Sequence, residues 1–403
     1  MKKILLWSSI AAIMTACSSD DPNENTTYHP ITLTPQQKEV VDGYKEFSYD
    51  FFREAVNDID ENENVIVSPY SMANMLSMLS NAADAETKAS ITALLNIPTS
   101  IDINEVNKSL YDQIMSLNDR VELSICRSLW SKENVRLNNQ FKNCIINDYH
   151  AQHSIFTSPQ SLLADFRDWL NKASHGMISD MNIDANESTK VLLADLMYFK
   201  GQWLSPFNKA DSHPGIFHNL DGTESEVTMM ENKIGLTWIS TIYYDLISIP
   251  FNDNSCHFEI LLPGDGYDVN DLIANLQQDL FTPSPETAEK YEFKSSSGMI
   301  PVILPRFEID IEIKPNKVLS RMGLSNNWSG MLDDNEALHI KFIQKSAIKV
   351  DEEGATASSA TSMTGDSAIN FEAGEPFIVD RPFVYILRGP GDIILQMGKI
   401  CKL

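Results

Sequence analysis

Near its C-terminus the chain contains the stretch Val350-Asp351-Glu352-Glu353-Gly354-Ala355-Thr356-Ala357-Ser358-Ser359-Ala360-Thr361-Ser362-Met363-Thr364-Gly365-Asp366-Ser367-Ala368-Ile369-Asn370-Phe371. From Ala355 onward it has no proline, lysine or arginine, and most of its side chains are small. This composition is typical of an exposed loop, and a plain solvated linker would have it too.

The same stretch has the side-chain pattern of a strand, because successive residues of an extended chain point to opposite faces. The first face would be uncharged and mostly small, with Ala355, Ala357, Ser359, Thr361, Met363 and Gly365. The second face would be mostly polar, with Thr356, Ser358, Ala360, Ser362, Thr364 and Asp366. Such a strand buries no charge, and without proline it keeps every ladder donor. The pattern favours an exposed loop that is able to become a strand.

The flanking sequence predicts a fold of the α+β class. Thr34-Pro35-Gln36-Gln37 is a helix start with a capping residue, and Ser68-Pro69 opens another helix. Residues 307–313 alternate apolar and acidic side chains, as a half-exposed strand does. Strands are also predicted over 383–387 and 393–397, joined by a Gly-Pro-Gly-Asp turn. No Pro- or Gly-rich linker divides residues 40–403, so we expect one domain there.

The N-terminus has the features of a bacterial export signal. Two lysines precede an apolar stretch that is too short to span a bilayer, which takes roughly 20 apolar residues. The stretch ends Met14-Thr15-Ala16-Cys17, which resembles a lipobox. We therefore expect removal of residues 1–16, lipidation of Cys17 and a tether over residues 17–39. Acidic residues after Cys17 favour the outer face of the outer membrane, with the lipid anchor as the only membrane contact.

Composition excludes several function classes. The 403 residues have a formal net charge of −25, so the surface repels nucleic acids. The chain has no nucleophile elbow, zincin motif or phosphate-binding loop, and two nearby histidines alone make a poor metal site. We expect no enzyme activity, no metal and no cofactor. The four remaining cysteines, Cys126, Cys144, Cys256 and Cys401, are too few for a disulfide scaffold, and we expect buried free thiols.

Six motifs spread over residues 40–403 resemble those of the serpins, the serine protease inhibitors. They are Asn64-Val65-Ile66-Val67-Ser68-Pro69-Tyr70-Ser71, Tyr198-Phe199-Lys200-Gly201-Gln202-Trp203, Val227-Thr228-Met229-Met230, Leu304-Pro305-Arg306-Phe307, the hinge-like stretch Val350 to Ala360, and Asp380-Arg381-Pro382-Phe383. The resemblance implies helices packed around three β-sheets, and a reactive loop over about residues 354–376.

The resemblance also implies a mechanism. A protease cleaves the loop and is acylated by it, and the cut loop then inserts as a central strand of the large sheet and traps the enzyme. The native state would be metastable. Insertion starts at the hinge, residues Glu352, Glu353, Gly354, Ala355, Thr356, Ala357, Ser358, Ser359 and Ala360, whose first-entering side chains are small. This favours a monomeric inhibitor of serine proteases from a host or from competing bacteria. Two alternatives stay open: cysteine proteases are a further target class, and the chain is alternatively a non-inhibitory binding or structural protein.

The scissile bond is assigned by counting within the loop. In inhibitory members it lies about 17 residues beyond the hinge glutamate, here Glu352, which gives Ala368 and Ile369. Counting back from Pro382 would favour Phe371 instead. A small apolar residue at Ala368 suits an elastase-like pocket, whereas Phe371 would suit a chymotrypsin-like one. Without Lys or Arg in the loop, trypsin-like targets are disfavoured.

Two positions depart from the family pattern beneath the point where the sheet opens. The family uses two serines, an asparagine and a histidine there, and this chain has Ser68, Ser71, Asp195 and Gln344. A buried carboxylate is costly unless it is hydrogen-bonded, and Gln344 can donate through its amide. Our hypothesis is that Asp195 and Gln344 substitute together for the usual pair. Trp203 matches the family tryptophan where the loop enters the sheet.

Overall fold

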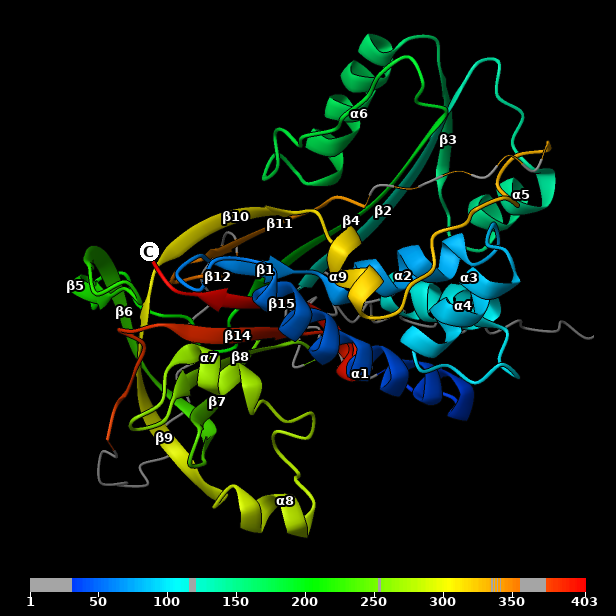
Figure 1. Ribbon diagram of the computed structural model, residues 1–403. Helices are drawn as coiled ribbons and strands as arrows, with labels where there is room; N and C mark the ends of the chain where they lie inside the picture. The colour runs from blue at the N-terminus through cyan, green and yellow to red at the C-terminus, as the bar shows by residue number, and fades with distance from the viewer. Residues whose placement is uncertain are drawn as a thin grey trace, which may run out of the picture.

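The structure is a computed structural model that describes residues 31–115, 121–252, 255–334, 336, 338, 340, 342–355 and 375–403. Among these residues, no helix has the length and apolar character needed to cross a lipid bilayer. Figure 1 shows helices gathered at one end of the molecule and around long, twisted strands.

Both helix starts predicted from the sequence are confirmed. Thr34 caps α1: its Oγ1 accepts from the Gln37 backbone N–H at 3.3 Å, and the Gln37 side chain accepts from the Thr34 N–H at 2.8 Å. Pro69 begins α2 directly after Ser68. The helices are α1 (Pro35–Asn57), α2 (Pro69–Leu79), α3 (Ala85–Leu94), α4 (Ile103–Met115), α5 (Asn139–Asn147), α6 (Pro159–Ala173), α7 (Val269–Ala274), α8 (Pro285–Lys290) and α9 (Asn316–Arg321).

The largest sheet has nine strands, in the order β1-β15-β14-β8-β7-β6-β9-β13 with β5 beside β6. All of its pairs are antiparallel except β13 with β9. The predicted C-terminal hairpin is confirmed as β14 and β15, joined through a short 3₁₀ turn at Pro390–Asp392. The strands of the nine-stranded sheet are β1 (Val65–Val67), β5 (His213–His218), β6 (Glu224–Ser240), β7 (Tyr244–Pro250), β8 (His257–Pro263), β9 (Lys294–Pro305), β13 (Phe377–Ile378), β14 (Phe383–Arg388) and β15 (Ile394–Ile400).

A second sheet has four strands and separates two helices. Its order is β12 (Gly354–Ala355), β4 (Val191–Gln202), β2 (Val121–Lys132) and β3 (Gln152–Phe156). On one face α6 packs through a small apolar cluster that includes Trp130, Phe166 and Leu196. The other face meets α2, because the alternate residue Asp195 contacts Ser71. Thus β4 lies between α6 and α2.

The third sheet is the pair β10 (Phe307–Ile313) and β11 (Gln344–Val350), in antiparallel register. The strand predicted over 307–313 is confirmed, with Phe307 and Ile313 buried and Glu308 and Asp310 exposed. Figure 1 shows this pair as ribbons separate from β2 and β4.

The four cysteines beyond the N-terminal segment are free thiols, as expected from the sequence. Cys256 and Cys401 are buried as expected, whereas the expectation of burial was wrong for Cys126 and Cys144, which are half-buried. Burial raises the pKa of the Cys401 thiol to about 11, so it stays protonated at neutral pH.

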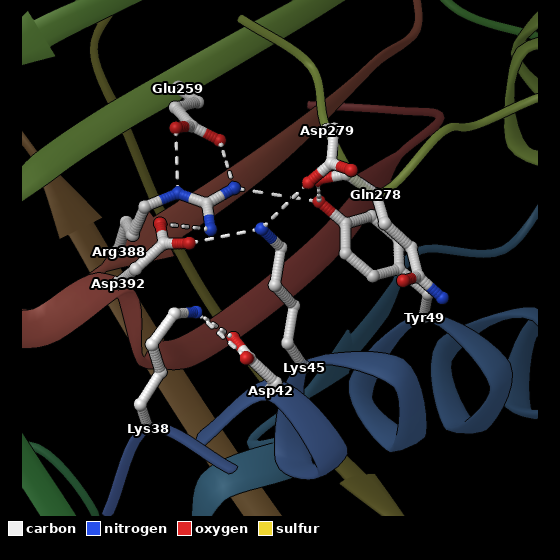
Figure 2. A network of polar contacts seen from close by, with 9 residues as sticks. All are labelled: Lys38, Asp42, Lys45, Tyr49, Glu259, Gln278, Asp279, Arg388 and Asp392. Carbon is white, nitrogen blue, oxygen red and sulfur yellow. Dashed lines mark hydrogen bonds and ion pairs between the residues drawn. The ribbon is translucent and has the colours of Figure 1, made fainter. Parts of the chain in front are cut away.

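A buried ion pair joins two strands of the large sheet, and Asp392 connects it to α1 (Figure 2). The Arg388 guanidinium on β14 donates to both carboxylate oxygens of Glu259 on β8, at 2.7 and 2.9 Å. These side chains are only 9% and 2% exposed. Arg388 also contacts Asp392, whose other oxygen accepts from Lys45 of α1 at 3.0 Å.

We expect Arg388→Met to lower the free energy of unfolding by about 3–5 kcal/mol, because it leaves the Glu259 carboxylate buried without its cation. Lys38→Met is the matched control, since the Lys38–Asp42 pair on α1 is 67% and 55% exposed and should contribute below about 1 kcal/mol. Chemical unfolding followed by circular dichroism measures both. Equal losses in the two variants would contradict this assignment.

Candidate functional site

The hinge begins at a tight turn that a single tryptophan holds. Asp351 and Gly354 exchange backbone hydrogen bonds at 3.0 and 3.3 Å. The indole N–H of Trp203 donates to the Asp351 carbonyl at 2.9 Å, and its backbone N–H donates to the Glu353 carbonyl at 3.1 Å. Trp203 is 1% exposed and stacks on Phe251 with ring centroids 4.8 Å apart. Trp203 therefore contacts the turn that directly precedes β12.

A buried carboxylate anchors the same turn. The Glu352 side chain is 1% exposed, accepts from the Ser212 hydroxyl at 2.7 Å and forms an ion pair with Arg306. Burial alone would raise the pKa of the Glu352 carboxyl, but the hydrogen bonds from Arg306 and Ser212 outweigh it, so this pKa is lowered. Glu353 points outward and pairs with Lys209. These contacts fix the chain just before it enters the sheet.

Gly354 fits a position that other residues cannot occupy. Its φ is +146°, and a Cβ atom there would overlap the carbonyl oxygen of Gly201. From this point β12 pairs with β4: Gly354 lies opposite Gln202 and Ala355 opposite Gly201. The first two residues after the turn thus already form the start of an antiparallel strand on the edge of β4.

A groove continues from β12 between β4 of the four-stranded sheet and β11 of the two-stranded sheet, and not within the nine-stranded sheet; we call it the central groove. Three cavities lie along it, of about 50, 450 and 60 Å³, and residues of both strands or their immediate flanks line each one. In the part of the chain that the structure describes, β4 pairs only with β2 and β12, and β11 only with β10. Both strands therefore offer backbone donors and acceptors to an additional strand.

Beneath the groove, Ser68 contacts the β11 side. Gln344, the first residue of β11, accepts from the Ser68 N–H at 2.9 Å and donates to the Ser68 carbonyl at 2.8 Å. The Ser68 hydroxyl donates to the Leu395 carbonyl of β15 at 2.8 Å. Gln344 is thus fixed to the backbone that begins α2.

Ser71 contacts the β4 side. Its hydroxyl donates to Asp195 at 2.7 Å, and the other carboxylate oxygen accepts from Arg127 Nε at 2.8 Å. Both charged side chains are 2% exposed. Burial would lower the pKa of the Arg127 guanidinium, but the facing Asp195 carboxylate outweighs it and raises that pKa. The structure gives Asp195 and Gln344 separate partners rather than each other.

Arg127 is the residue that sequence reasoning missed. It is the only charged residue of β2 between Glu122 and Lys132. It lies in register with Asp195, the only charged residue of β4 before Lys200. Two opposite charges in the middle of paired strands were the available signal. Several predicted site residues lie outside the described residues: Cys17, the hinge residues 356–360, Ala368, Ile369 and Phe371.

The Glu352 anchor should depend on pH. Its lowered pKa means that the carboxylate stabilises the folded state above the unfolded-state pKa of about 4.3 and loses this effect as pH falls through the folded-state pKa. At pH 7 we expect Glu352→Gln to lower the free energy of unfolding, measured at the first transition, by about 1–2 kcal/mol. The difference from wild type should become smaller below about pH 4.

Glu353→Gln is the control for that measurement, because its ion pair with Lys209 lies at the surface and contributes little. Thermal unfolding of the three proteins between pH 3 and pH 7 gives the comparison. A Glu352→Gln effect that stays constant over this range would argue against an ionised anchor.

Comparison with known proteins assigns this arrangement to a family. The sequence profile described as "Serpin (serine protease inhibitor)" matches residues 42–403. Plasminogen activator inhibitor 1 of Neovison vison is 25% identical over 364 residues, which cover 85% of this chain and 88% of that protein. Serpin-Z10 of Arabidopsis thaliana is 26% identical over 362 residues, which cover 85% of this chain and 92% of that protein.

Solved structures have the same fold. The native thermophilic serpin tengpin matches with a TM-score of 0.77 at 24% identity, over 93% of this chain and 97% of tengpin. Human thyroxine-binding globulin, in a structure with bound thyroxine, matches with a TM-score of 0.77 at 18% identity, over 91% and 99%. The expected α+β serpin fold is confirmed. The matching profile and relatives are described as inhibitors and not as enzymes. This chain belongs to the serpin family.

Proposed function

We propose that the protein is a suicide inhibitor of serine proteases that inserts its cleaved loop into the central groove. The main support is the groove itself, because β4 and β11 offer facing edges and β12 already occupies the first positions of the strand between them. Relatives named as protease inhibitors, such as plasminogen activator inhibitor 1, support the target class.

The energetic driving force is the pairing of both groove edges. A strand of a dozen residues gains hydrogen bonds on two sides, each contributing a net ~0.5–1.5 kcal/mol. The sum is on the order of 10 kcal/mol, similar to the whole stability of a typical domain. The intact form is then metastable, and insertion is fast enough to precede release of the acylated protease.

The dimensions of the groove favour small inward side chains. The smallest of its three cavities, of about 50 Å³, lies between the two strands and is also lined by Ser68 and Ser71. The inward face expected for residues 355–361 consists of Ala, Ala, Ser and Thr at every second position. Side chains of this size require the groove to widen less than larger ones would.

The target class proposed is elastase-like serine proteases, with Ala368–Ile369 as the scissile bond and Phe371 as the alternative. The basis is the small apolar character of Ala368 and the lack of Lys and Arg in residues 355–371. Cysteine proteases are a second target class. A non-inhibitory relative with the same scaffold is the alternative function.

Mixing the protein with pancreatic elastase should give a covalent complex that survives a denaturing gel. Ala357→Arg should abolish this band and give only cleaved protein, because the arginine would point into the groove. Ser358→Arg should keep more of the band, because the next residue of an extended strand points to the opposite face, away from α2. The two variants add the same charge one residue apart, so they differ only in the face affected.

Cleavage without a covalent band in the wild type would indicate a non-inhibitory protein. Equal trapping by the two arginine variants would contradict insertion in the proposed register. Sequencing the released peptide locates the scissile bond. The nicked wild type should also unfold at a higher temperature than the intact protein.

We also propose that the chain is anchored by lipid at Cys17 to the outer face of a bacterial outer membrane, with residues 40–403 as one domain beyond a tether. The support is the sequence Met14-Thr15-Ala16-Cys17 and the acidic residues that follow it. We expect Cys17→Ser to move the protein from the membrane fraction to the soluble fraction. Protease accessibility on intact cells reports the face, and unchanged fractionation would rule out lipidation at Cys17.

A further inference from the structure

The two walls of the central groove are connected to the start of α2 by contacts of unequal strength. On the β11 side, Gln344 makes two hydrogen bonds to the Ser68 backbone, and the Ser68 hydroxyl bonds to β15. On the β4 side, the hydrogen bond from the Ser71 hydroxyl to Asp195 is the one polar contact between α2 and β4 among the described side chains. A movement of β4 away from α2 therefore breaks fewer bonds than a movement of β11.

The charge of Asp195 is balanced entirely on the β4 side. Arg127 lies directly opposite on β2, and its Nη1 donates to the Tyr149 carbonyl at 3.0 Å. The guanidinium lies 5.5 Å from the ring centre of Tyr111 on α4 and 5.9 Å from that of Tyr149. These contacts hold the guanidinium in one place beneath β2 and β4.

We propose that Arg127 is a positioning residue that sets the rate at which the central groove opens. It holds the Asp195 carboxylate so that Oδ1 accepts from Ser71, and a hydrogen bond to a carboxylate is about twice as strong as one between neutral groups. Because Arg127 and Asp195 lie on paired strands, the ion pair stays intact when β4 moves. Opening then breaks one strong hydrogen bond and separates no buried charges. The inference rests on the proposed strand insertion.

The test uses uncleaved protein that is warmed mildly. It measures the rate at which the loop inserts without cleavage, which gives a form that unfolds at a higher temperature. Ser71→Ala should speed conversion on the order of tenfold, the value of one charge-assisted hydrogen bond. Arg127→Met should speed it similarly, and Arg127→Lys should restore part of the wild-type rate. In the double variant, Ser71→Ala should add little to Arg127→Met, because both remove the same contact.

Ser77→Ala is the matched control. It removes another buried hydroxyl from α2, one that bonds to Tyr44 and the Ala73 carbonyl away from the groove. It should lower the stability of the intact and the nicked protein alike and leave the conversion rate within about twofold of wild type.

Additive effects of Ser71→Ala and Arg127→Met would overturn the inference and make Arg127 a packing residue only. If Arg127→Met does not fold, Ser71→Ala is the deciding variant. An unchanged conversion rate in Ser71→Ala would show that the Ser71–Asp195 hydrogen bond does not contribute to the barrier to groove opening, and would overturn the inference. A wild type that never converts, and is not stabilised by nicking, would refute the proposed function. A wild type that converts at the same rate as all of the variants would refute only the role of Arg127.

Discussion

The free edge of β4 is the constraint on which the rest of the architecture depends. The strand has twelve residues, and β12 pairs with only Gly201 and Gln202 on that side among the described residues. Such an edge is a template for another strand, and each pair of backbone groups left to water forgoes part of the stability that a full ladder would give. The surrounding elements must therefore hold the two edges apart while keeping them accessible from one end. The helices α2 and α6, on opposite faces of β4, hold the edges apart. The anchored turn at Glu352 and Gly354 keeps the groove accessible from one end.

The anchored turn determines the direction in which a strand can grow. Trp203 and the Glu352–Arg306 ion pair fix the chain before the groove, and Gly354 lets it turn close to the Gly201 carbonyl. Because this end is fixed, any strand that forms must extend from Ala355 along β4 in one register. The register in turn decides which side chains point inward, since a shift by one residue exchanges the two faces. The alternation of small and polar residues in the sequence is useful only because the turn holds its starting point.

Local elements could be predicted from the sequence, and the polar contacts of the site could not. The Thr34 capping box, the alternation over 307–313 and the turn at 389–392 depend on residues close together in the chain. The partners Arg127 and Asp195 are 68 residues apart, and Arg306 and Glu352 are 46 apart. Only the register of a sheet or the folding of the hinge brings them together. Asp195 and Gln344 both depart from the family pattern, and only the structure shows that they lie on opposite sides of the groove with different partners, Ser71 and Ser68.

The placement of the buried charges is consistent with a groove that must widen. Both buried arginine–carboxylate pairs, Arg127–Asp195 and Arg388–Glu259, join neighbouring strands of one sheet, so neither spans the groove. Separating such a pair would cost roughly 3–5 kcal/mol, enough to oppose opening strongly. Among the described residues, an ion pair that does span it, Lys190–Glu336 at the far end, is 35% and 50% exposed, and pairs of this kind contribute at most about 1 kcal/mol. The wall of β2 and β4 is thus cross-linked internally, and its ion pair does not tie it to the opposite wall, which is the arrangement that a groove accepting a new central strand requires.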